Sequence, residues 1–128
     1  MKQPAANNTQ HVEKVTSDEQ VKLYLTISPL LHAAFGELKE FSKKKQDDAM
    51  NVNKVKMINR LLEKAKEILK DEPTAEYLDL LDEDQLPSYS DAVLMMSQYI
   101  SAMSKFHDDH YHYDNDLGSV WDNSGHWK

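Results

Sequence analysis

The sequence contains no cysteine, which excludes both a disulfide framework and a zinc site with cysteine ligands. Glycine and proline are scarce, at three and four of 128 residues, as is typical of a helical protein. No apolar run approaches the roughly 18 residues that a membrane-spanning helix needs. The first residues also lack the apolar core of a signal peptide. We therefore expect a cytoplasmic protein with no membrane partner.

Positive charge is scarce outside the middle of the chain, and only one arginine is present. Residues 36–70 carry ten basic and six acidic groups, whereas residues 71–128 carry two basic and thirteen acidic groups. The net charge of −7 makes direct binding to DNA or RNA unfavourable. The uneven distribution predicts instead that the acidic C-terminal half attracts a basic protein partner, or the basic middle of a second copy in a homo-oligomer.

The clearest helical signal lies in residues 91–106, where apolar residues recur at steps of three and four. Ser88 or Ser90 is placed to cap this helix. Residues 55–69 show the same periodicity opposite a face of lysines and one arginine. A short helix is expected between these two segments, followed by an acidic loop.

A further helical region is predicted to begin after Ser17, because Ser17 and Gln20 have the spacing of a capping box. Pro29 is expected to end this helix, since proline lacks an amide proton and disfavours helical geometry in the preceding residue. A new helix is predicted to start at Pro29, with Ser28 as its cap, and to run to about residue 45.

These elements together predict an all-α fold, namely a small antiparallel bundle of three long and one or two short helices. Residues 1–16 contain almost no large apolar residue and are predicted to form a flexible N-terminal arm. Residues 17–106 are assigned to the helical bundle domain. Residues 107–128 are assigned to a C-terminal tail rich in His, Asp and Trp.

The tail holds four of the six histidines and both tryptophans. A continuing helix would place His107, His110 and Asp114 on one face, whereas an extended chain would align His110, His112 and Asp114. Either set offers imidazole and carboxylate ligands to a divalent transition metal. A polar tail of this composition produces such triples by chance, so metal binding is kept as an alternative and no cofactor is expected.

The aromatic residues of the tail have two interpretations. Trp121 and Trp127 either fold back over an apolar groove of the bundle or anchor another protein. Termini stay disordered unless something holds them, which favours docking on the bundle.

No catalytic signature is present in the sequence. It has no cysteine nucleophile, no Gly-x-Ser-x-Gly motif, and no histidine with glutamate three positions before it, as a di-iron bundle would need. We therefore predict a non-enzymatic protein-protein interaction module that binds a basic partner, as an inhibitor, an immunity protein or an accessory subunit would. The predicted contact residues are acidic or aromatic: Asp82, Glu83, Asp84, Asp108, Asp109, Tyr111, Tyr113, Trp121 and Trp127. The alternatives are a metal-binding protein using His107, His110, His112 and Asp114, and a self-assembling structural component.

Overall fold

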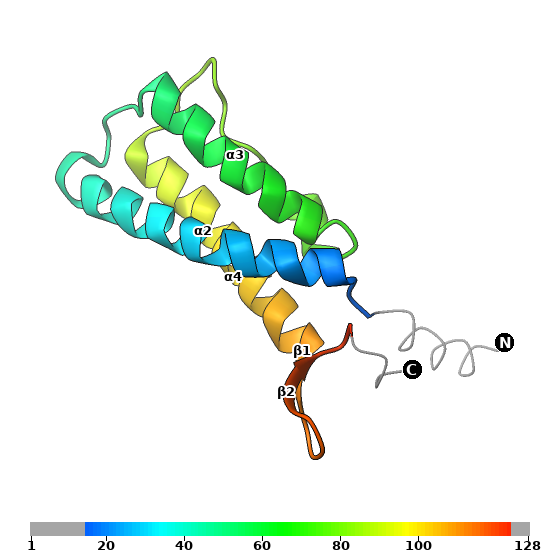
Figure 1. Ribbon diagram of the computed structural model, residues 1–128. Coiled ribbons are helices and arrows are strands. Elements are labelled where there is room, and N and C mark those ends of the chain that lie inside the picture. Colours follow the sequence, from blue (N-terminus) through cyan, green and yellow to red (C-terminus); the bar gives the residue numbers. More distant parts are fainter. Residues whose placement is uncertain (1–14, 124–128) are drawn as a thin grey trace, which may run out of the picture.

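The computed structural model describes residues 15–123 of the chain (Figure 1). Three long helices form its body: α2 (Asp18–Lys45), α3 (Val52–Ile68) and α4 (Tyr89–His110). A 3-10 helix, η1 (Pro73–Tyr77), lies between α3 and α4. Two antiparallel strands, β1 (Tyr111–Asp114) and β2 (Gly118–Trp121), follow α4. The bundle prediction therefore holds in its coarse form, but the all-α assignment was wrong for the C-terminal segment.

Helix α2 begins where the sequence predicts and continues where it does not. Ser17 and Gln20 form the predicted capping box, each side chain accepting from the other residue's amide at 3.0 Å. The predicted break at Pro29 was wrong, because α2 runs through it without interruption. A proline leaves the carbonyl four residues earlier, that of Leu25, without a helical donor. Leu25 is 58% exposed and Pro29 is also exposed, so water can hydrogen-bond this carbonyl.

Helix α4 runs in the opposite direction to the one it would have if it followed α3 in a simple up-and-down bundle. The backbone amide of Met50 donates to the carbonyl of Pro87, and that of Tyr89 donates to the carbonyl of Asp48. These bonds place the start of α4 beside the start of α3, so α3 and α4 run parallel and α2 runs antiparallel to both (Figure 1). The connection between α3 and α4 must therefore return along the bundle.

Buried polar groups hold this returning connection in place. The Asn59 side chain, 4% exposed, donates to the carbonyl of Leu81 and accepts from its amide, both at 2.9 Å. The Tyr99 hydroxyl donates to the carbonyl of Asp79 at 2.7 Å. Burial, with a smaller contribution from the Asp79 charge, raises the pKa of Tyr99, so the hydroxyl stays protonated and remains a donor.

The core contains the apolar stripe that the sequence predicts for α4. Ala92, Met96, Tyr99, Met103 and Phe106 are all buried, and they pack with apolar residues of α2 and α3. Ser88 caps the helix through its hydroxyl, which accepts from the amide of Asp91 at 3.1 Å. Helix α2 contacts both α3 and α4, so each of the three helices buries one apolar face in a shared core.

Ordered structure continues on both sides of residues 17–106. Helix α4 continues four residues past Phe106 to His110, and the chain then turns back as the β1–β2 hairpin. Thr16, placed in the N-terminal arm by the sequence, is only 6% exposed and hydrogen-bonds to Asp122. Residues 1–14 of that arm lie outside the described residues.

Candidate functional site

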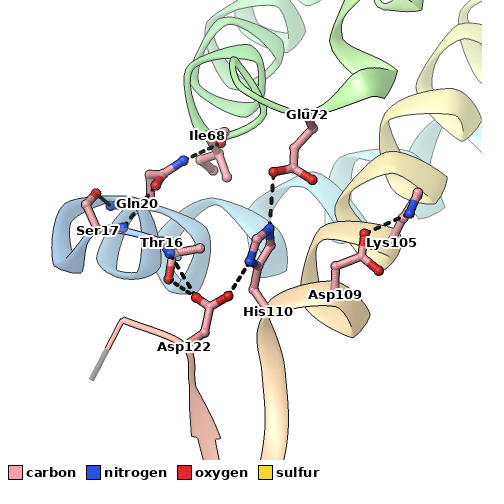
Figure 2. Close-up of polar contacts among 9 residues, drawn as sticks. All are labelled: Thr16, Ser17, Gln20, Ile68, Glu72, Lys105, Asp109, His110 and Asp122. Atoms are coloured by element: carbon pink, nitrogen blue, oxygen red, sulfur yellow. Dashed lines mark hydrogen bonds and ion pairs between the residues drawn. The ribbon is translucent and has the colours of Figure 1, made fainter. Parts of the chain in front are cut away.

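Four segments distant in sequence meet around the side chain of His110 at the end of α4 (Figure 2). Its Nδ1 lies 2.5 Å from Oδ2 of Asp122, and its Nε2 lies 3.2 Å from Oε2 of Glu72. The other carboxylate oxygen of Asp122 accepts from both the backbone amide and the hydroxyl of Thr16, each at 2.8 Å. We call Thr16, Glu72, His110 and Asp122 the His110 cluster. It joins the residues before α2, the turn after α3, the end of α4 and the end of β2.

Electrostatics favour the charged form of His110. The hydrogen bond to Glu72 raises the pKa of His110 to about 9; burial opposes this shift, and Asp122 adds to it. The side chains of His110, Glu72 and Asp122 are only 8%, 14% and 10% exposed, so water screens these interactions little. At neutral pH the imidazolium donates from both ring nitrogens to two carboxylates. With both nitrogens engaged, this histidine is suited to holding segments together rather than to exchanging a proton with a bound molecule.

A group of aromatic rings in edge-on and tilted contacts attaches the hairpin to the bundle beside this cluster. The Trp121 ring lies 5.2 Å from Tyr24, 5.1 Å from Tyr111 and 5.4 Å from His107, measured between centroids. It is half-buried and packs against the core, which corresponds to the docked interpretation of this tryptophan. Trp121 is thus largely occupied within its own chain. Trp127 lies outside the described residues.

The predicted acidic contact residues fall in two separate places. Residues 82–84 belong to the loop before α4, whereas Asp108 and Asp109 lie in its last turn. Helix α4 has 22 residues, which corresponds to about 33 Å of helix. The structure therefore does not gather these carboxylates into one site.

Several of these carboxylates already have partners within the chain. The Asp82 side chain accepts from the amides of Asp84 and Gln85 at 2.8 and 2.9 Å, and these bonds lower the pKa of Asp82. Glu83 accepts from the Asn59 amide at 3.2 Å. Asp109 pairs with Lys105 at 2.7 Å on the surface of α4. Such contacts shape the loop and the helix face rather than leaving the groups available.

The exposed part of the predicted site is the hairpin and the helix turn preceding it. Tyr113 is 72% exposed and Leu117 is 56% exposed. Asp116 is exposed, and the Asp108 side chain is 75% exposed and lies 3.5 Å from Nδ1 of His107. We call Asp108, Tyr113, Asp116 and Leu117 the hairpin surface. Figure 1 shows the hairpin projecting past the end of the three helices.

Sequence reasoning missed Asp116 and Leu117, and it missed the grouping of Thr16, Glu72 and Asp122 around His110. The hairpin had a local signal, because the turn-forming residues 114–116 and Gly118 separate two segments containing aromatic residues. Gly118 has φ of 82°, a left-handed conformation that glycine adopts without strain. The cluster had no such signal, since Glu72 is 38 residues from His110 and Thr16 is 106 residues from Asp122.

The proposed metal ligands are not assembled into a site. His107 contacts the rings of Tyr111 and Trp121, and His110 is bound to two carboxylates. His112 and Asp114 lie further along, on β1. Within residues 15–123, no three His, Asp or Glu side chains are arranged to hold a metal ion. The metal-binding alternative therefore gains no geometric support from the described residues.

Comparison with protein-family models, with curated proteins and with solved structures found no match to this chain. Among the helices of residues 15–123, none combines the length and apolar character needed to cross a bilayer. Function must therefore be inferred from the residues themselves and from their arrangement.

Proposed function

We propose that this protein is a non-enzymatic interaction module that binds a basic partner protein through the hairpin surface. The observation that carries the proposal is the exposure of Tyr113 and Leu117 on a projecting hairpin that also bears the exposed Asp116, with the exposed Asp108 in the helix turn before it. An exposed aromatic ring can supply binding affinity, and exposed carboxylates on the same and the preceding segment can attract a partner of opposite charge.

The charge distribution supports a basic partner. Residues 71–128 carry thirteen acidic groups and only two basic ones. Asp84 and its neighbours in the loop before α4 add a second exposed acidic region away from the hairpin. A field of one sign accelerates encounter with a molecule of opposite charge, while the buried apolar contacts slow dissociation. We assign steering to the loop acids and contact to the hairpin surface.

The structure changes which residues we propose as contacts. Trp121 contacts the rings of Tyr24 and Tyr111, so it attaches the hairpin to the helices. We therefore propose Tyr113, in place of Trp121, as the exposed aromatic residue that contacts the partner. Inhibitor, immunity protein and accessory subunit all remain compatible with such a surface, because each binds another protein without chemistry of its own.

The test is affinity capture from cells of the native host, with the full chain as bait and mass spectrometry to identify bound proteins. A hairpin variant carrying Asp108→Asn, Tyr113→Ala and Asp116→Asn should lose a basic protein that the unmodified chain retains. The reason is that the variant removes two charges and the exposed ring without touching a buried side chain.

The control variant removes the same kinds of group elsewhere. Asp47→Asn, Tyr77→Ala and Asp91→Asn affect residues that are also exposed, and Tyr77 is 69% exposed. This variant should retain the basic protein. Equal capture by both variants, or capture of acidic proteins only, contradicts the proposed use of the hairpin.

A further inference from the structure

The hairpin has only two strands, so each strand has one edge without a neighbour in residues 15–123. The register pairs Tyr111 with Trp121 and Tyr113 with Ser119, and the amide of Asp122 donates to the carbonyl of His110 at 2.8 Å. Hydrogen-bonded and non-hydrogen-bonded pairs alternate along an antiparallel ladder. The bond at residues 110 and 122 therefore makes Tyr113 and Ser119 a non-hydrogen-bonded pair, whose backbone groups point outward.

The outer edge of β1 is available around Tyr113. The amide of Tyr111 points away from β2, as the alternation requires, and it donates a hydrogen bond to the carbonyl of His107. No partner for the backbone amide or carbonyl of Tyr113 is found in residues 15–123. An exposed strand with unpaired backbone groups is a template for another extended segment.

The outer edge of β2 has other neighbours near its end. Asp122 accepts from Thr16, and the Asn123 side chain donates to Asp18 at 2.6 Å. In Figure 2, Thr16 lies with Asp122 on one side of His110, while Asp109 lies on the other. The segment before α2 thus approaches the β2 side of the hairpin.

We infer that the partner of the proposed function binds by adding an extended, basic segment as a third strand along the outer edge of β1, at the backbone of Tyr113. This inference rests on the proposed function and specifies the form of the partner. The charge around the edge selects the occupant: Asp108 precedes β1, Asp116 follows it, and the hairpin itself contains no lysine or arginine. A second copy of the hairpin would bring like charges together, whereas a lysine-rich or arginine-rich strand neutralises them.

The experiment selects 12-residue peptides from a random displayed library, using the full chain as the target. Peptides alternating Lys or Arg with β-branched residues should be enriched, because this pattern suits an added strand beside carboxylates. The selected peptides are then measured against two variants, Tyr113→Pro and Tyr113→Ala. Both variants lack the aromatic ring of tyrosine, but only proline also removes the outward-pointing backbone amide. Proline is tolerated at an edge-strand position whose amide makes no hydrogen bond to the neighbouring strand.

Tyr113→Pro should bind the peptides roughly tenfold more weakly than Tyr113→Ala, because a backbone hydrogen bond is lost in addition to the ring. Peptide binding to the unmodified chain should also slow hydrogen exchange at the amide of Tyr113. This second measurement does not depend on the proline variant keeping its hairpin. A peptide methylated at the backbone nitrogens facing β1 should lose binding in the same way.

Three results overturn the inference: enrichment of peptides without basic residues, binding that is unaffected by backbone methylation, or unchanged exchange at Tyr113 in the complex. Its failure is distinguishable from failure of the proposed function. If the hairpin variant still loses the basic host protein while methylated peptides bind normally, the hairpin remains the contact surface and strand addition is excluded.

Discussion

His110 shows how one side chain can fix the position of several segments. Its two ring nitrogens reach Asp122 and Glu72, and Asp122 in turn holds Thr16. Asn59 has the same role on the returning connection, where it satisfies both backbone groups of Leu81. Buried polar groups are costly when unpaired, so each of these residues ties local geometry to the correct tertiary arrangement.

The raised pKa of His110 predicts a stability that declines at alkaline pH. Because the folded-state pKa is about 9 and an unfolded histidine has a value of about 6.5, the contribution is complete below pH ~6.5 and is lost as pH rises through ~9. The expected loss is about 2–3 kcal/mol between pH ~7 and ~10. Urea unfolding at several pH values measures it, with His110→Gln as the reference. If the two proteins give parallel pH profiles, His110 is not the group responsible.

Asn59→Ala should destabilise the protein by about 2–3 kcal/mol, because it leaves the amide and carbonyl of Leu81 buried without partners. The free energy of unfolding from urea titration measures this effect. Asn53→Ala is the matched control, since Asn53 is exposed near the start of the same helix. Asn53→Ala should not lose stability, because alanine has a higher helix propensity than asparagine. A similar loss in both variants contradicts the assignment of the effect to Leu81.

Among the elements, the β1–β2 hairpin depends most on its surroundings. Each strand has four residues, and an isolated two-stranded hairpin is only marginally stable in water. Its attachment comes from Trp121 packing on Tyr24 and Phe106, and from Asp122 in the His110 cluster. Helix α2, by contrast, carries its own start signal in Ser17 and its own charge pattern, with acids in the first turn and lysines in the last.

Trp121→Ala should therefore loosen the hairpin while the three helices remain folded. Amide exchange in residues 111–121 should become faster, because the ring that covers Tyr24 and Tyr111 is removed. Helical circular dichroism should change little at moderate temperature. The Val120→Ala variant is a suitable comparison, since Val120 is half-buried on the same strand and belongs to no ring contact. Cooperative unfolding of the helices together with the hairpin contradicts this prediction.

For the whole molecule, charge separation is the dominant property. The middle of the chain is basic and the C-terminal part is acidic, with an overall charge of −7. In the folded protein the C-terminal charges include the exposed Asp108 and Asp116 of the hairpin surface. Together with the exposed acids of the loop before α4, these charges give the molecule two separate acidic regions that can attract a basic partner.

Association with the captured basic partner should consequently slow as salt rises. The association rate should fall by about tenfold or more between ~50 and ~500 mM NaCl, because screening shortens the range of attraction. The dissociation rate should change much less, since contacts at Tyr113 and Leu117 are apolar. Stopped-flow mixing or surface plasmon resonance measures both rates. A salt-independent association rate contradicts electrostatic steering.

The sequence alone determined the main helical regions, the start of α2 at Ser17 and the apolar stripe of α4, because helical periodicity and capping act over three or four residues. It did not determine the continuation of α2 through Pro29, which depends on the solvent exposure of Leu25 and Pro29. Tertiary structure alone decided that Trp121 faces the bundle, that Tyr113 faces solvent and that His110 meets Glu72 and Asp122. These outcomes depend on segments between 12 and 106 residues apart, and no local pattern specifies which distant groups will be neighbours.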